Sequence, residues 1–159
     1  DGMLRDADTL LNKVDSEVYV KIPVTMEGIK TIKLLKAQNI HVTGTAIYSK
    51  QQGFLAMEAG ADCIAPYFNR MENMGINSDD VIASLAEMID LYHYNTEILA
   101  ASFKNAGQVD RAFLAGAQTA TMDPSILEAA LTFSHITSAV DAFEQDWKSI
   151  YGDKTLSDL

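Results

Sequence analysis

The sequence predicts an α/β fold in which strands alternate with helices and pair in parallel. Five short runs of apolar and β-branched residues are separated by stretches whose apolar residues recur at helical spacing. The tripeptide Phe-Leu-Ala is followed by a glycine and then by a predicted strand at two places, at 54–61 and from residue 113. Such alternation favours right-handed crossovers between parallel strands. The pattern leaves two architectures open, a doubly wound sheet and a (β/α)8 barrel.

The predicted elements follow one another with short connections. Strands are predicted at residues 18–24, 40–45, 61–66, 98–102 and 118–121. Helices are predicted at residues 3–14, 25–38, 49–59, from 78, 106–115, from 123 and at 138–151. No glycine-rich phosphate fingerprint follows a strand, which counts against a nucleotide-binding sheet.

Capping residues support several of these boundaries. Thr25 precedes a helical pattern as an N-cap, and Gly60 stands where a helix would stop. Ser78 is expected to cap the next helix, because two aspartates follow it in the first turn. Residues 67–77 between these helices are predicted to form a loop, the longest candidate for a functional one.

The composition of the chain limits the partners and the cellular compartment that can be expected. The chain has 159 residues, enough for one domain with a sizeable core, and its 12 basic and 22 acidic residues give a formal net charge of −10. Without a basic stripe, neither nucleic acid nor an anionic membrane surface is an expected partner. No apolar run is long enough for a membrane span. Cys63 is the only cysteine, so no internal disulfide can form, and a reducing cytoplasmic setting is expected.

Lys21 interrupts the apolar run at 18–24, and this predicts a lysine in a buried strand. Burying an unpaired ammonium group is costly, so such a lysine tends to lose its proton and become a nucleophile. A neutral amine on a rigid strand can attack a carbonyl group and form a Schiff base. The alternative is a lysine on a strand edge whose charged end reaches water.

Other polar residues fall at the predicted carboxyl ends of strands, where a barrel holds its active site. Tyr67 could relay protons through a water molecule, which Thr45 could hold. Arg70 could bind a phosphate group as a bidentate donor, and Ser102 could donate to the same phosphate.

Each of these residues also has a plain structural interpretation. Tyr67 could be an ordinary half-buried tyrosine, Thr45 a strand residue, and Ser102 a turn hydroxyl. Arg70 could pair with Glu72. The three histidines lack the spacing of metal ligands, so no metal site is expected.

Four segments together resemble the transaldolase family, and most closely its small fructose-6-phosphate aldolase-like subgroup. They are Val-Lys-Ile-Pro-Val-Thr at 20–25, Gly-Thr-Ala-Ile-Tyr at 44–48, Ala-Pro-Tyr-Phe-Asn-Arg at 65–70 and Ala-Ala-Ser-Phe-Lys at 100–104. The resemblance implies a (β/α)8 (TIM) barrel and class I aldol chemistry on a sugar phosphate, with no metal or other cofactor.

The resemblance also implies a role for each site residue. Lys21 would form the Schiff base, Tyr67 would act as acid and base through a water that Thr45 helps to hold, and Arg70 and Ser102 would bind the substrate phosphate. The aldolase-like members carry tyrosine where true transaldolases tend to have phenylalanine, so Tyr67 favours an aldolase. The alternative is a transaldolase, which moves the dihydroxyacetone unit between sugar phosphates.

The family's first three strands have no counterpart in this sequence. Residues 1–159 are therefore expected to form a single partial TIM-barrel domain, the C-terminal part of about five βα units, which cannot close a barrel alone. A further alternative is a catalytically inactive fragment that acts only in assembly. The helix predicted at 138–151 carries an apolar stripe of Val140, Phe143, Trp147 and Ile150, and we expect it at a subunit interface of a homo-oligomer.

Overall fold

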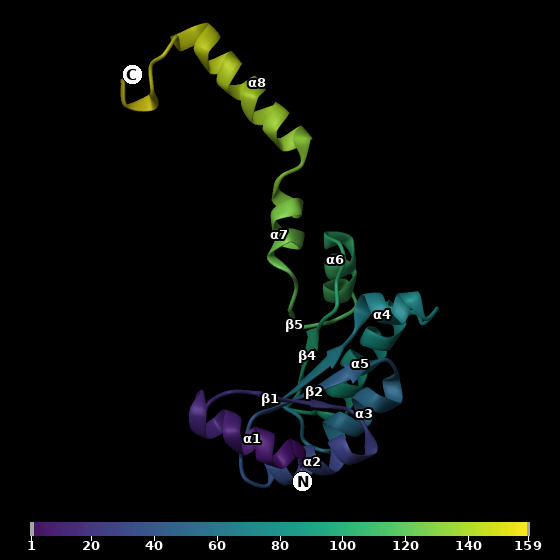
Figure 1. Ribbon diagram of the computed structural model, residues 1–159. Helices are drawn as coiled ribbons and strands as arrows, with labels where there is room; N and C mark the ends of the chain where they lie inside the picture. Colours follow the sequence, from purple (N-terminus) through teal and green to yellow (C-terminus); the bar gives the residue numbers. More distant parts are fainter. Residues whose placement is uncertain (1, 159) are drawn as a thin grey trace. The chain divides into compact units, whose positions relative to one another are not determined.

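A computed structural model describes residues 2–158 and confirms the α/β class (Figure 1). Within these residues, five strands form one sheet in the order β1-β2-β3-β4-β5, and each pairs with its neighbour in parallel. The strands are β1 (Val20–Pro23), β2 (Val42–Ile47), β3 (Cys63–Pro66), β4 (Glu97–Ala100) and β5 (Thr119–Ala120).

Helices connect the strands and continue beyond the last one. They are α1 (Gly2–Lys13), α2 (Met26–Lys36), α3 (Lys50–Glu58), α4 (Phe68–Asn73), α5 (Ser78–Tyr92), α6 (Ala106–Leu114), α7 (Pro124–Leu131), α8 (Ser134–Tyr151) and the 3-10 turn η1 (Leu156–Asp158). None of the helices in residues 2–158 is both long and apolar enough to span a membrane.

The order of the strands makes the sheet an open part of a barrel. Neighbouring strands in space are also neighbours in sequence, as in a (β/α)8 barrel, and β1 and β5 are the two edges of the described sheet. A barrel of this type needs eight strands for closure. The predicted partial TIM-barrel fold with five parallel strands is therefore confirmed.

Burial alternates along β1, as expected for a strand with one covered face. Val20 and Ile22 are buried, whereas Lys21 and Pro23 are exposed. Fully buried side chains come from strands and helices alike, among them Ile32, Ile47, Met57, Ile64, Phe68, Met71, Ile82, Leu85 and Ile98. Each such side chain stabilises the fold by about 1.5–3 kcal/mol through its removal from water.

Two of the predicted caps are confirmed. The Thr25 side chain accepts a hydrogen bond from the backbone N–H of Gly28, as an N-cap should. A Cβ at Gly28 would lie 1.9 Å from the Pro23 carbonyl oxygen, so only glycine lets α2 begin this close to β1. Gly60 follows α3 with φ of +90°, the left-handed conformation typical of a helix stop.

Three predicted boundaries are wrong. The segment predicted as a loop at 67–77 contains the helix α4. The N-cap of α5 is Asn77 rather than Ser78, and the buried hydroxyl of Ser78 instead donates to the Phe68 carbonyl at 2.9 Å. The helix predicted at 138–151 begins four residues earlier, at Ser134.

The chain forms two compact units, residues 1–122 and residues 123–159. The first contains the sheet and the helices α1 to α6. The second contains α7, which begins with Pro124 after the N-cap Asp123, and α8, in which no residue is buried. The single domain expected over 1–159 stays a prediction.

Asp62 joins three elements at the amino ends of the strands. Its carboxylate accepts hydrogen bonds from Lys36 Nζ at 2.7 Å and from the Val42 backbone N–H at 2.8 Å. Burial raises the pKa of this carboxyl, but the bonds from Lys36 and Val42 outweigh burial, so the pKa of Asp62 lies below its ordinary value. The ionised carboxylate therefore stabilises the start of β2 and β3.

We expect Asp62→Asn to lower the free energy of unfolding by about 1–3 kcal/mol at neutral pH, because a charged acceptor becomes a neutral amide. The pKa of Asp62 is lower in the folded state than in the unfolded state. The stabilisation by the ionised Asp62 carboxylate is therefore complete above the unfolded-state pKa of about 4, and it is lost as the pH falls through the folded-state pKa. Urea titrations at several pH values measure the difference, which should shrink in acid. Asp90→Asn, at an exposed position of α5, is the control. Equal losses in the two variants at neutral pH would contradict the role of Asp62.

Candidate active site

Polar side chains from neighbouring strands lie at the carboxyl edge of the sheet. Thr45 lies near the end of β2, Tyr67 directly follows β3, and Ser102 follows β4. Tyr67 and Ala101 form an additional parallel bridge, which extends the pairing of β3 and β4 to this edge. The parallel sheet thus brings three of the predicted site residues to one edge.

Thr45 and Tyr67 are in direct contact. The buried Thr45 hydroxyl donates a hydrogen bond to the Tyr67 phenol oxygen, with 3.1 Å between the two oxygens. The backbone N–H of Tyr67 donates to the Ile47 carbonyl at 3.0 Å, which fixes the tyrosine to the end of β2. A phenol held in this way can exchange a proton with a ligand or with a water molecule.

Arg70 lies over the ring of Tyr67. Its guanidinium carbon is 4.7 Å from the ring centroid, within the range of a cation–π contact. It donates to the Tyr48 phenol oxygen at 3.3 Å, and this hydrogen bond raises the pKa of Arg70. Arg70 is exposed and has no carboxylate partner in residues 2–158, so its positive charge is not paired with an acidic side chain there. The alternative pairing with Glu72 is absent, because Glu72 binds Arg111.

Tyr48 contacts both Tyr67 and Arg70 and was not predicted as a site residue from the sequence. It follows β2 as Tyr67 follows β3, and the two rings meet edge to face with centroids 5.7 Å apart. The criterion for predicting site residues from the sequence was a polar residue at the carboxyl end of a predicted strand. Tyr48 also follows a strand end, so the same criterion could have identified it.

Ser102 adopts a left-handed backbone conformation with φ of +64°. Its carbonyl oxygen accepts a hydrogen bond from the Asn69 backbone N–H at 2.9 Å, and the preceding carbonyl, of Ala101, accepts from Phe68 at 2.8 Å. These two bonds join the start of α4 to the segment after β4. The Ser102 hydroxyl has no hydrogen-bond partner among residues 2–158 and is half-buried.

Lys21 is separate from these contacts. Its side chain is exposed and forms no hydrogen bond or ion pair within the described residues. The expectation of a buried lysine is wrong because β1 is an edge strand, whose second neighbour on the sheet is absent from residues 2–158. Lys21 pairs in register with the buried Thr43, so the two side chains share a face of the sheet.

Cys63 lies on the same face, in register with Thr43. Burial raises the pKa of the Cys63 thiol, and the nearby carboxylates of Glu97 and Asp62 raise it further. The thiol therefore stays protonated at neutral pH and is a poor nucleophile. No group of three or more His, Cys, Asp or Glu side chains in residues 2–158 is arranged to hold a metal ion.

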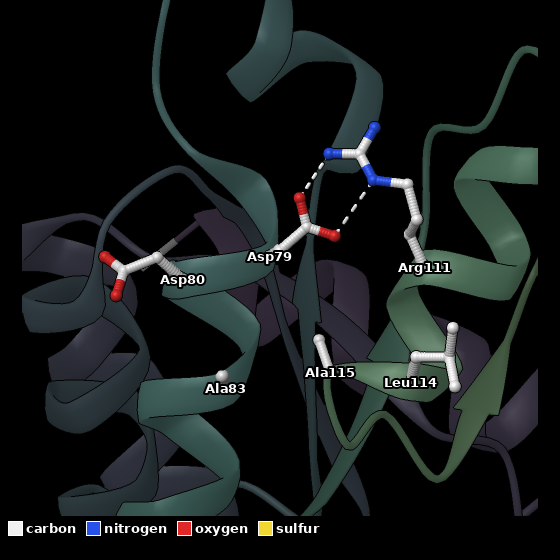
Figure 2. A pocket seen from close by; sticks show the side chains of 6 residues that line it. All are labelled: Asp79, Asp80, Ala83, Arg111, Leu114 and Ala115. Carbon is white, nitrogen blue, oxygen red and sulfur yellow. Dashed lines mark hydrogen bonds and ion pairs between the residues drawn. The ribbon is translucent and has the colours of Figure 1, made fainter.

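A surface pocket between α5 and α6 contains none of the predicted site residues (Figure 2). It is lined by Asp79, Asp80, Ala83, Arg111, Leu114 and Ala115. Arg111 binds Asp79 through two hydrogen bonds at the rim and so joins the two helices.

Barrel enzymes have their active sites at the carboxyl edge of the parallel strands, where this chain has a phenol, a hydroxyl and a guanidinium group. Comparison with known proteins gives the type of enzyme. The family model described as transaldolase/fructose-6-phosphate aldolase matches residues 1–154. A protein of Streptococcus pneumoniae named probable fructose-6-phosphate aldolase is 44% identical over 156 residues, which is 98% of this chain and 70% of the relative.

The chain thus belongs to the transaldolase/fructose-6-phosphate aldolase family and is an enzyme of the aldolase/transaldolase type. The resemblance noted in the sequence is confirmed. Its four segments contain Lys21, Thr45 and Tyr48, the Tyr67–Arg70 stretch and Ser102.

Proposed function

We propose that the chain is a class I aldolase that cleaves or forms a carbon–carbon bond in a ketose phosphate through a Schiff base on Lys21. Family membership and the name of the pneumococcal relative support the substrate class. The observation that carries the proposal is the hydrogen bond between Thr45 and Tyr67 beneath the Arg70 guanidinium. It combines a proton-transfer group with a binding group for an anion.

The proposed reaction begins when the Lys21 amine adds to the ketone carbon and water leaves, which forms an iminium ion. The bond between the third and fourth carbons then breaks. Its electron pair moves into the iminium to give an enamine, while the hydroxyl on the fourth carbon loses its proton and becomes the aldehyde. Protonation of the enamine and hydrolysis release dihydroxyacetone and restore the amine.

In this scheme Tyr67 moves the protons through a water molecule that Thr45 helps to hold, since the two residues are already hydrogen-bonded. Arg70 and Ser102 bind the substrate phosphate, and Tyr48 orients Arg70. The iminium provides the electron sink, so the scheme uses no metal or other cofactor. A reducing cytoplasmic compartment suits a chain whose only cysteine is Cys63.

The Schiff base is tested by borohydride reduction in the presence of a ketose phosphate. We expect a covalent adduct on Lys21, and we expect Lys21→Ala to abolish it, because no other amine occupies the proposed position. Intact mass and peptide mapping measure the adduct. Lys33→Ala, at an exposed position on α2, is the matched control and should label like the parent chain. An adduct on Lys36 or Lys104 would refute the assignment.

The choice between aldolase and transaldolase is tested at Tyr67. Release of free dihydroxyacetone needs protonation of the enamine, whereas transfer to an aldehyde does not, so we expect Tyr67→Phe to slow release by roughly 10²-fold. Transfer to an added aldehyde should be favoured. Product analysis with and without the aldehyde measures the partition. Tyr19→Phe, at an exposed tyrosine that stacks on His41, is the control. A Tyr67→Phe enzyme with unchanged partition would argue against this role.

We further propose that α8 packs on a second copy of the chain. Val140 and Phe143 are 56% and 71% exposed, and Ile150 lies on the same stripe and is exposed as well. Such an apolar stripe on a helix without buried residues needs cover. The family resemblance, which implies ring-like oligomers that use this helix, supports a homo-oligomer contact.

We expect Phe143→Glu to reduce the oligomer size, because a carboxylate in an apolar interface is costly to desolvate. Gln145→Glu adds the same charge on another face of α8 and should leave the assembly unchanged. Light scattering with size-exclusion chromatography measures the mass of both variants. A monomeric parent chain, or equal masses for the parent and Phe143→Glu, would contradict the proposed contact.

A further inference from the structure

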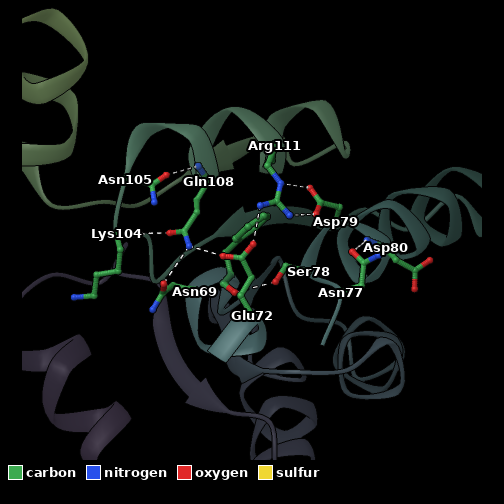
Figure 3. A network of polar contacts seen from close by, with 11 residues as sticks. Asn69, Glu72, Asn77, Ser78, Asp79, Asp80, Lys104, Asn105, Gln108 and Arg111 are labelled. Carbon is green, nitrogen blue, oxygen red and sulfur yellow. Dashed lines mark hydrogen bonds and ion pairs between the residues drawn. The ribbon is translucent and has the colours of Figure 1, made fainter. Parts of the chain in front are cut away.

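Gln108 is the centre of a polar network between α4 and α6 (Figure 3). Gln108 is only 6% exposed, and each polar atom of its side chain has a partner. The amide nitrogen donates to Asn69 Oδ1 at 3.1 Å and to Glu72 Oε2 at 2.5 Å. The amide oxygen accepts from the Lys104 backbone N–H at 2.8 Å. One buried amide therefore contacts both α4 and the segment after β4.

The two segments that Gln108 contacts carry the proposed phosphate ligands. Asn69 is adjacent to Arg70 on α4, and α4 begins directly after Tyr67. The segment after β4 includes Ser102, whose carbonyl accepts from the Asn69 backbone N–H. A shift of α4 relative to this segment would change the separation of Arg70 and Ser102.

Arg111, one turn further along α6, fixes the other end of the network. Its guanidinium donates to Glu72 at 2.7 Å, binds Asp79 of α5 and lies over the Phe68 ring, 5.1 Å from the centroid. The hydrogen bonds with Asp79 and Glu72 raise the pKa of Arg111, so its charge is permanent. Because Arg111 binds one oxygen of Glu72, the other oxygen remains directed at Gln108.

We propose that Gln108 is a positioning residue that sets the spacing between Arg70 and Ser102 for the substrate phosphate. The inference rests on the proposed function. The position requires an amide, since the side chain donates in two directions and accepts in a third. A carboxylate of the same size keeps the acceptor for Lys104 but places a second negative charge against Glu72.

The test is the variant Gln108→Glu, assayed with glyceraldehyde 3-phosphate and with glyceraldehyde as acceptors for dihydroxyacetone. We expect KM for the phosphorylated acceptor to rise about tenfold, because the phosphate ligands lose their spacing. KM for glyceraldehyde and kcat for both acceptors should stay within about twofold of the parent values. Gln51→Glu, at an exposed position on α3, is the matched control and should leave all values unchanged. Unchanged KM values, or equal losses with both acceptors, would overturn the inference.

Two further variants keep the test decisive. In the double variant Gln108→Glu/Glu72→Gln, position 108 carries the carboxylate and position 72 the amide. The two side chains can then form a hydrogen bond again, so part of the lost selectivity for the phosphorylated acceptor should return. Asn69→Ala removes one partner of Gln108 and should raise KM for the phosphorylated acceptor about threefold by the same reasoning. If Gln108→Glu does not fold, Asn69→Ala decides, and an unchanged KM ratio there would overturn the inference.

Amide hydrogen exchange separates this inference from the proposed function. The N–H groups of Phe68 and Asn69 donate across to the segment after β4, so their exchange should speed up in Gln108→Glu, or in Asn69→Ala if that variant must decide. Exchange in α3 should not change. A parent chain without aldol activity would refute the proposed function, whereas unchanged exchange at 67–73 would refute the positioning role of Gln108.

Discussion

The register of the parallel strands is the constraint on which the rest of the structure depends. Each strand pairs with the next one in the sequence, so successive strand ends arrive at one edge of the sheet in chain order. The Tyr67 N–H bonds to Ile47 of β2, and Pro66 and Phe68 on either side of Tyr67 bond to Ala101 after β4, so the pairing continues past β3. The register of β2 against β3 shifts between Gly44 and Ile47, and Thr45 lies in this shifted stretch, where it contacts Tyr67.

The strands were the most predictable part of the fold. The run at 61–66 contains β3, because a buried parallel strand is a nearly continuous apolar run. The run at 18–24 contains β1, although burial alternates along that edge strand. The strand predicted at 118–121 is only Thr119–Ala120 in the structure. Among residues 2–158 it is an edge strand that pairs only with β4, and neither of its side chains is fully buried. Sequence pattern therefore identified which segments pair but not how far the pairing extends.

The errors concern features that tertiary contacts decide. The helix α4 has only six residues, too few for a periodic pattern, and bonds from its first residues to the segment after β4 hold it. Asn77 and Ser78 are both good capping residues, and only the buried Phe68 carbonyl explains why the serine hydroxyl turns inward. The exposure of Lys21 follows from an edge position that a strand's own residues do not reveal. The sequence pattern places Gln108 on a helix, but two of its side-chain partners, Asn69 and Glu72, are more than 30 positions away in α4.

The backbone of Ser102 has a consequence for the evolution and engineering of this chain. A left-handed conformation costs an L-residue about 1–2 kcal/mol, a cost that glycine would avoid. Glycine, however, has no hydroxyl to offer a phosphate. Under the proposed phosphate-binding role, stability and ligand binding favour different residues at position 102, and a library selected only for thermal stability would favour glycine there.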